Sequence, residues 1–376
     1  MRIAPSVETA LAALTQAARH DLSCACGTDQ HRQRGEDGLW IYPAALPSGR
    51  RVPMLKVLQA TGCERACTYC AERCGGQGRA LCLPPEALAT AFVDLRRRGR
   101  VAGLFLSSAI RGGAVATMDR MLATAELLRG RHAFRGYLHL KLIPGCRPDQ
   151  VERAMALATR VSVNMEAPTA AHLARIAPAK NFHAHILAPM RQVARAIGRG
   201  DFPSGSQTTQ LVVGAAGETD REIATAAADG YRVLKLARVY YSAWQPVAGT
   251  GPAAPVPLLR EHRLYQTDFL LRSYGFSLDE IDFDPAGNLP LDTDPKTGWA
   301  QRHPERFPVE VNHASREELL RVPGLGPRSA ARLLAMRRQR RVREVEALRA
   351  AGAAWKVAAP YLLLDGKPAE RQLRLC

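Results

Sequence analysis

Short apolar runs typical of strands alternate with helical segments between Val52 and about Ser242. The helical segments include PPEALATAFVDLRRRG, which begins with prolines and ends at Gly99. The candidate strands are MLKVLQATG (54–62), GLFLSS (103–108), GYLHLKLIP (136–144), RVSVNME (160–166), TTQLVVG (208–214) and RVLKLARVYY (232–241). This alternation predicts an α/β fold in which helices cover a parallel sheet.

The number of strands favours a partial (β/α)6 TIM-like barrel over a complete eightfold barrel. A doubly wound open sheet is the structural alternative, because periodicity alone does not give the order of the strands. In a barrel the active residues gather at the carboxyl ends of the strands. The loop after the first strand, which contains Cys63, is therefore the expected place of a site.

That loop, GCERACTYCAERC (62–74), holds four of the nine cysteines of the chain. Cys63, Cys67 and Cys70 have the spacing C-x3-C-x2-C, so that three thiolates can hold three corners of an iron–sulfur cubane. The fourth iron would keep an open position for a ligand. The alternative is a closed zinc or cluster site that also uses Cys74, but the loop contains no His and lacks the paired C-x2-C of zinc ribbons.

With the preceding strand and Tyr69 before the third cysteine, this spacing resembles the radical S-adenosylmethionine (SAM) superfamily. The resemblance implies a [4Fe–4S] cluster on Cys63, Cys67 and Cys70, with SAM as the second cofactor. It implies reductive cleavage of SAM to a 5′-deoxyadenosyl radical, in which the cofactor carries the chemistry and the protein orients it. A reducing partner such as a flavodoxin or ferredoxin is also implied.

The resemblance assigns SAM contacts to the strand ends. In SSAIRGG, Ser107 and Ser108 stand where many members carry a Gly-Gly-Glu stretch that meets the methionine amino group. Lys141, at the end of the third strand, is expected to meet a carboxylate or phosphate, or else to be an exposed barrel lysine. Tyr69 completes this part of the expected cofactor site.

Two later strand ends complete the expected SAM site. Asn164 and Glu166 in VNMEAP are placed to bind ribose hydroxyls, although the carboxylate could instead pair with a nearby arginine. Gly214 in VVGAAGETD resembles the strand-five glycine motif, which lets the backbone approach adenine because glycine has no Cβ.

The charge of the chain favours a polyanionic partner. Lys and Arg total 52 against 35 Asp and Glu, for a formal net charge of +17. The alternative is that these charges lie on solvated faces.

Near the C-terminus, the segment NHASREELLRVPGLGPRSAARLLAMRR predicts two helices joined by a glycine turn. Ser315 and Glu318 have capping-box spacing, and Pro327 suits the first position of a helix.

This segment resembles the helix-hairpin-helix family, whose motif binds DNA without reading its sequence. Glycines in the turn would let backbone N–H groups meet a phosphate, and arginines would add contacts to the phosphate backbone. The expected DNA-binding residues are Gly324, Gly326, Arg328, Arg337 and Arg338. The alternative is an α-hairpin used for protein contact. A second, degenerate hairpin around Gly352 would complete an all-α module.

Sequence pattern and resemblance together predict four parts: 1–50, an N-terminal helix with an irregular extension; 51–248, the barrel; 249–305, a bridging segment; and 306–376, which the resemblance implies to be a helix-hairpin-helix DNA-binding domain. This order resembles a bacterial family of radical SAM proteins assigned to DNA modification or repair and often associated with a uracil-DNA-glycosylase-like partner. The segments that carry the resemblance include CTYCAER, GYLHLKLIPG, DTDPKTGWA and LLRVPGLGP. A non-catalytic iron–sulfur DNA-binding protein, or a radical SAM enzyme acting on RNA or protein, are the alternatives.

The beginning of the chain predicts an amphipathic helix that carries Glu8, rather than a secretory signal, and no apolar run is long enough to cross a bilayer. A cytoplasmic protein without membrane contact is expected, where clustered thiols bind metal more often than they form disulfides. Tyr240, Tyr241 and Trp244 are candidates for stacking on a base, or else core residues.

Overall fold

The chain folds into two compact units. The computed structural model describes residues 6–18, 33–34, 38–45, 51–75, 80–202, 205–246 and 254–369. The first unit comprises Met1–Glu218 with Asp229–Glu261, and the second comprises Thr219–Ala228 with His262–Cys376. Most of the segment expected to bridge the two domains therefore groups with the C-terminal residues. The other domain borders stay predictions.

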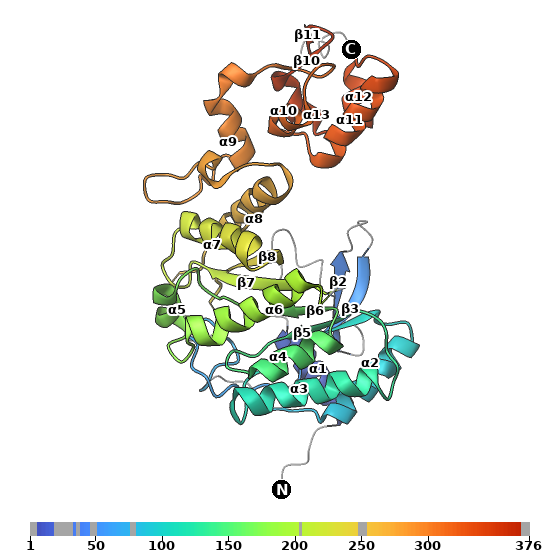
Figure 1. Cartoon of the computed structure of the whole chain (residues 1–376), viewed down its shortest axis with the longest axis vertical. Coiled ribbons are helices and arrows are strands. Elements are labelled where there is room, and N and C mark those ends of the chain that lie inside the picture. Colours follow the sequence, from blue (N-terminus) through green and yellow to red (C-terminus); the bar gives the residue numbers. More distant parts are fainter. Residues whose placement is uncertain are drawn as a thin grey trace. The chain divides into compact units, whose positions relative to one another are not determined.

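The first unit is built on a sheet whose strand order follows the sequence (Figure 1). From β3 to β8, each strand pairs in parallel with the next. These strands are β3 (Arg51–Leu58), β4 (Gly103–Ser107), β5 (Leu138–Lys141), β6 (Arg160–Ser162), β7 (Gln207–Val213) and β8 (Leu236–Ala243). Because the order never reverses, the partial (β/α) barrel is confirmed and the doubly wound alternative is wrong.

Helices cover one face of this sheet. Each packs on the next along the chain, α2 on α3, α3 on α4 and α4 on α6. Their bounds are α2 (Pro85–Arg97), α3 (Gly113–Arg129), α4 (Pro148–Leu157) and α6 (Ala188–Arg199); α5 (Ala170–Ile176) and α7 (Asp220–Val233) complete the connections. Leu104, Leu106, Leu138 and Leu140 are fully buried and mark the covered face, since alternate strand residues point to opposite sides.

The N-terminal part of the sheet differs from the expectation. The sequence predicts an irregular extension after the first helix, but β2 (Trp40–Ala45) pairs antiparallel with β3, and β1 (Gln33–Arg34) pairs with β2. Pro43 lies opposite Pro53, a position where neither residue has an N–H to donate. Because proline is unusual in paired strands, the sequence pattern does not predict this strand pair. The predicted first helix is confirmed as α1 (Val7–Ala17), which packs on β2 and β3.

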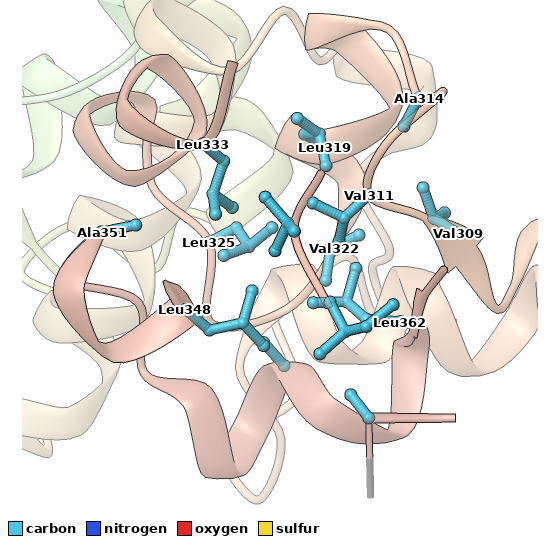
Figure 2. Packing of buried hydrophobic residues seen from close by; sticks show 14 of the residues in the cluster. Val309, Val311, Ala314, Leu319, Val322, Leu325, Leu333, Leu348, Ala351 and Leu362 are labelled. Atoms are coloured by element: carbon cyan, nitrogen blue, oxygen red, sulfur yellow. The ribbon is translucent and has the colours of Figure 1, made fainter. Parts of the chain in front are cut away.

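The second unit has its own apolar core, which includes Leu319, Val322, Leu325, Leu333 and Leu348 (Figure 2). Its helices include the C-terminal part of α8 (Leu258–Ser273), α9 (Pro295–Arg302), α10 (Arg316–Arg321), α11 (Pro327–Gln339), α12 (Val345–Ala350) and α13 (Trp355–Ala358). Both predicted helix starts are confirmed. Ser315 and Glu318 form the capping box of α10, and Pro327 is the first residue of α11.

The expectation of an all-α C-terminal module is wrong. A three-stranded sheet brings together β9 (Val309–Glu310), β10 (Leu362–Leu364) and β11 (Lys367–Pro368) in the order β11-β10-β9. The Glu310 carboxylate accepts hydrogen bonds from the backbone N–H groups of Asn312, at 2.9 Å, and Gly366, at 2.8 Å. These bonds stabilise a strand pairing between segments that are far apart in the sequence, which local patterns do not reveal.

Candidate functional site

The cysteine loop leaves β3 through a turn that requires glycine. Gly62 has φ +73°, and a Cβ there would lie 3.0 Å from the Cβ of Ala80. The Gly62 N–H donates to the Glu72 carboxylate at 3.0 Å, and the Cys63 N–H donates to the Glu72 carbonyl at 2.7 Å. The two ends of the loop are thereby tied together, which places all three cysteines of the motif on a closed segment.

Hydrogen bonds also tie this loop to neighbouring parts of the barrel. The Glu64 carboxylate accepts from the N–H groups of Gly112, at 3.0 Å, and Gly113, at 3.1 Å, where α3 begins. A carboxylate is favoured at a helix N-terminus. The Thr68 N–H donates to the Ile176 carbonyl, at the end of α5, at 2.8 Å. The glycines of SSAIRGG thus anchor the cysteine loop.

The loop and the strand ends enclose a cavity of about 240 Å³. All three cysteines of the motif line it, and so do most of the predicted SAM-binding residues. The predicted residues at this cavity are Cys63, Cys67, Cys70, Tyr69, Ser107, Ser108, Lys141, Asn164 and Glu166. They come from the loop after β3 and from the carboxyl ends of β4, β5 and β6, so the structure brings together residues up to about a hundred positions apart in the sequence.

The three thiols provide a donor set that fits an iron–sulfur cluster. The Sγ of Cys63 accepts from the N–H groups of Arg65 and Ile110, each at 3.4 Å, as expected around a metal-bound thiolate. Within the described residues, no three His, Cys, Asp or Glu side chains are gathered as a single metal ion requires. Cys74 is exposed and does not line the cavity, which disfavours a closed four-cysteine site.

Burial favours the protonated form of two of these thiols, Cys67 and Cys70, in the absence of metal. Desolvation raises the pKa of Cys67, and raises that of Cys70 to about 12. The nearby Lys180 ammonium opposes both shifts. Metal binding must therefore displace protons, and the lysine compensates part of the thiolate charge that results.

Lys180 is a site residue that the sequence analysis missed. Its Nζ lies 3.0 Å from a carboxylate oxygen of Glu166 and donates to the Tyr69 hydroxyl at 2.8 Å. Both charged side chains are almost fully buried, at 10% and 7% exposure. Burial disfavours the charge on Lys180, but the Glu166 carboxylate together with Cys67 and Cys70 offsets this effect, and the pKa of Lys180 is raised. No motif in PAKNF marks this lysine, because only the fold brings it to Tyr69.

Glu166 is held in an unusual backbone conformation, with φ +66°. Its N–H donates to the Gln210 carbonyl at 2.9 Å, and its own carbonyl accepts from the Val212 N–H at 2.8 Å. A left-handed non-glycine residue is costly and persists where its surroundings hold it. The backbone of β7 does so here, and thereby aims the Glu166 side chain at Lys180 rather than at the arginine considered from the sequence.

Gly214 does not lie where the sequence predicts a contact with adenine, and the three aromatic candidates differ in how far they are buried. Gly214 has φ +79°, but a Cβ there would lie 2.3 Å from the Cγ2 of Val256, so a side chain already fills the space expected for adenine. Gly214 is not among the residues that line the cavity. Tyr241 and Trp244 are buried, at 1% and 2% exposure, and Trp244 borders the cavity, whereas Tyr240 is half-buried.

In the second unit, the predicted hairpin forms between α10 and α11. Gly324 has φ +78°, and a Cβ there would lie 2.7 Å from the Ala354 carbonyl, so the turn requires glycine. Gly326 is the N-cap of α11. Arg328 and Arg338 are exposed. Arg337 instead donates to two backbone carbonyls of its own unit, those of Val311 at 3.0 Å and Ala314 at 2.5 Å, which competes with a phosphate contact.

A buried lysine donates a hydrogen bond to the backbone of this turn. The Nζ of Lys296, in the segment DTDPKTGWA, donates to the Leu325 carbonyl at 2.6 Å and lies 4.6 Å from the ring centroid of Tyr274. Burial lowers its pKa to about 7, although Asp294 opposes the shift. The hairpin turn therefore depends on a residue of α9, about thirty positions earlier in the chain.

Comparisons with known proteins identify no family. No family model and no curated protein matches the sequence. Solved structures that match include the FeFe-hydrogenase maturase HydG from Carboxydothermus hydrogenoformans, with 13% identity, a TM-score of 0.45, and coverage of 58% of this chain and 51% of that chain. Methylornithine synthase (PylB) has 11% identity and a TM-score of 0.45, over 72% and 69% of the two chains.

A third match is the radical SAM methyltransferase TsrM from Kitasatospora setae, with 15% identity, a TM-score of 0.39, and coverage of 52% and 37% of the two chains. This chain thus spans about half the length of the HydG structure. These scores are too low to establish a shared activity. In the described ranges of the chain, no helix has the length and apolar character needed to cross a bilayer.

Replacing Lys180 by Met is expected to lower the free energy of unfolding of the first unit by about 3–5 kcal/mol, because the Glu166 carboxylate would stay buried without its partner. The double variant Lys180→Met/Glu166→Gln should be more stable than Lys180→Met alone. Urea unfolding of the reduced, metal-free protein measures both. Arg153→Met, which breaks the exposed pair with Glu126, is the control and should cost less than about 1 kcal/mol. A double variant as unstable as the single one would contradict the ion-pair interpretation.

The depressed pKa of Lys296 predicts a pH-dependent stability of the second unit. Between about pH 7 and pH 10.5 the unfolded state binds a proton at this lysine and the folded state does not, so the free energy of unfolding rises with pH. Urea unfolding measures the free energy of unfolding of wild type and of Lys296→Met. The value for wild type minus the value for Lys296→Met should rise from pH 7 to pH 9, by at most about 1.4 kcal/mol per pH unit. The control Lys356→Met removes an exposed lysine of the same unit. A pH-independent difference would show that Lys296 is charged in the folded state.

Proposed function

We propose that this protein is a radical SAM enzyme that acts on DNA. One observation carries the first part of the proposal. The three thiols of a C-x3-C-x2-C loop open into one cavity with polar residues from the carboxyl ends of successive parallel strands. That edge is where (β/α) barrels place their chemistry. The resemblance of the cysteine motif to the radical SAM superfamily supports the same assignment.

In this proposal Cys63, Cys67 and Cys70 hold a [4Fe–4S] cluster, and SAM occupies the rest of the cavity. When both are bound, the cluster would supply one electron that cleaves a carbon–sulfur bond of SAM, which yields methionine and a 5′-deoxyadenosyl radical. The chain orients the cofactor. Lys141 offers a cation for the methionine carboxylate, and Ser107, Asn164 and Gln210 offer hydrogen-bonding groups.

The second unit would deliver the enzyme to DNA. The hairpin turn at Gly324 and the start of α11 can present N–H groups to a phosphate, as helix N-termini do. The exposed Arg328 and Arg338 lie on the same helix and add cationic contacts that do not read sequence. The resemblance of LLRVPGLGP to helix-hairpin-helix modules, together with the net charge of +17, supports DNA over a protein partner.

The same resemblance suggests two protein partners. A flavodoxin or ferredoxin would supply the electron, and a uracil-DNA-glycosylase-like protein would act with the enzyme on DNA. We place the enzyme in the cytoplasm, because its proposed cluster needs cysteines that remain free thiols. Cys63, Cys67, Cys70 and Cys74 are all free in the structure.

The reconstituted protein, kept anaerobic with SAM and dithionite, is expected to release 5′-deoxyadenosine and methionine. Cys70→Ala should abolish the release because one corner of the cluster loses its ligand, whereas Cys74→Ala should retain it. Chromatography measures both products, and iron and sulfide analysis measures cluster loading. A loaded wild type without cleavage would contradict the radical assignment, and loss of cleavage in Cys74→Ala would indicate a closed site.

Replacing Arg328 and Arg338 by Gln is expected to weaken binding to a DNA duplex uniformly across sequences. Each lost phosphate contact should lower the slope of log K against log salt by about one. Fluorescence anisotropy over a range of salt concentrations measures affinity and slope. The matched control Arg97→Gln/Arg153→Gln removes two exposed charges of the first unit. Equal losses in both double variants would mean that net charge, rather than the hairpin, governs binding.

A further inference from the structure

A buried positive charge lies beside the cysteine loop. Lys180 Nζ donates to the Tyr69 hydroxyl at 2.8 Å and lies 5.5 Å from the centroid of the Tyr69 ring. Tyr69 stands between Cys67 and Cys70 in the sequence, and all four residues line the same cavity. The lysine side chain is only 10% exposed. Its charge is thus held at the loop that carries the thiols rather than at the surface of the protein.

The Tyr69 hydroxyl connects this charge to a thiol. Because Lys180 donates to the hydroxyl oxygen, the hydroxyl proton is left for another acceptor. Burial raises the pKa of Tyr69, and a side-chain hydrogen bond with Glu166 raises it further. Burial also raises the pKa of Cys67, and a side-chain hydrogen bond with Tyr69 acts in the opposite direction. Tyr69 therefore lies between the ion pair and one of the proposed cluster ligands.

The ion pair of Lys180 and Glu166 presents its positive end to the thiols. At Cys67, burial has the largest effect on the pKa, and the lowering by Lys180 exceeds the raising by Glu166. At Cys70, burial again has the largest effect, and Lys180 again lowers the pKa. Although the pair is formally neutral, these two cysteines therefore experience a net positive charge from it.

The Lys180 ammonium keeps one hydrogen-bond donor for a ligand. An ammonium has three N–H donors, and two of them point to Glu166 Oε1, at 3.0 Å, and to the Tyr69 hydroxyl. Among the residues that the structure describes, the third donor has no partner. A buried donor without a partner is costly. Since Lys180 lines the cavity, a negatively charged group bound there would satisfy this donor.

We propose that Lys180 raises the reduction potential of the cluster that Cys63, Cys67 and Cys70 are proposed to hold. This inference rests on the proposed function and deepens it, because it names a positioning residue for the electron-transfer step. One electron from the reducing partner adds one negative charge to the site. A fixed positive charge in a low-dielectric interior stabilises the reduced form more than the oxidised form. Net charge and hydrogen bonds to the sulfurs are among the features that set such potentials.

Redox titration of the full-length reconstituted protein, first without and then with SAM, tests this role. Anaerobic samples are poised at a series of potentials, and electron paramagnetic resonance measures the fraction of reduced cluster. Without SAM, Lys180→Met should lower the equilibrium constant for reduction by about tenfold or more, which is about 59 mV for one electron. Lys180→Arg should retain most of the wild-type potential. Glu166→Gln should raise the potential, because it removes the opposing charge.

Two further variants keep the test valid if Lys180→Met folds poorly. Lys180→Met/Glu166→Gln removes both charges and should still have a lower potential than wild type, because the intact pair presents its positive end to the thiols. The matched control Arg153→Met removes one exposed positive charge of the first unit and should titrate as wild type. Circular dichroism, with iron and sulfide analysis, confirms that each protein is folded and loaded.

Equal potentials in wild type, Lys180→Met and the double variant would overturn this role, even in a protein that cleaves SAM. A difference that arises only with SAM present would also overturn it and would make Lys180 a SAM contact. A Lys180-dependent potential in a loaded protein that does not cleave SAM would support this role and refute the radical function. A wild type that takes up no [4Fe–4S] cluster would refute both.

Discussion

The buried ion pair between Lys180 and Glu166 holds together the segments from which the cavity is made. Lys180 follows α5, Glu166 follows β6, and the Tyr69 hydroxyl that Lys180 also contacts belongs to the cysteine loop. In a low-dielectric interior neither charge is tolerated without the other. The left-handed backbone of Glu166 is maintained by β7 so that its carboxylate reaches the lysine. The pair thus couples the sheet to the loop that carries the thiols.

The hydrogen bonds of the cysteine loop arrange the thiols before any metal arrives. Glu64 at the start of α3 and Glu72 at the turn of Gly62 fix the loop from two sides. A binding site held by its own supporting contacts loses less freedom when its ligand binds. Lys180 adds a positive charge beside the Cys67 and Cys70 thiols, whose pKa values burial raises. Position and charge compensation therefore come from residues other than the three cysteines.

The second unit shows the same dependence on residues outside its motif. The glycine turn is packed against Ala354 near α13 and is supported by Lys296 of α9, while Arg321 stacks on Phe276 at 3.8 Å and pairs with Glu280 at 2.9 Å. Local signals predicted the capping box, the turn and the start of α11. They did not predict the small sheet or the internal hydrogen bonds of Arg337, because both depend on partners distant in sequence.

The sequence by itself determined the alternation of strands and helices, the thiol spacing and the hairpin turn, because each follows from residues within a few positions of one another. Only the tertiary structure decided that the strands lie in sequential order, that Pro43 and Pro53 face each other in a strand pair, and that Val256 fills the space beside Gly214. It also decided that Lys180 reaches Tyr69 across 111 positions of sequence. Periodicity indicates which side of a helix or strand is buried, but it does not indicate which distant side chain packs against that side. The cavity is lined by side chains that are distant in sequence, so local patterns could not predict it.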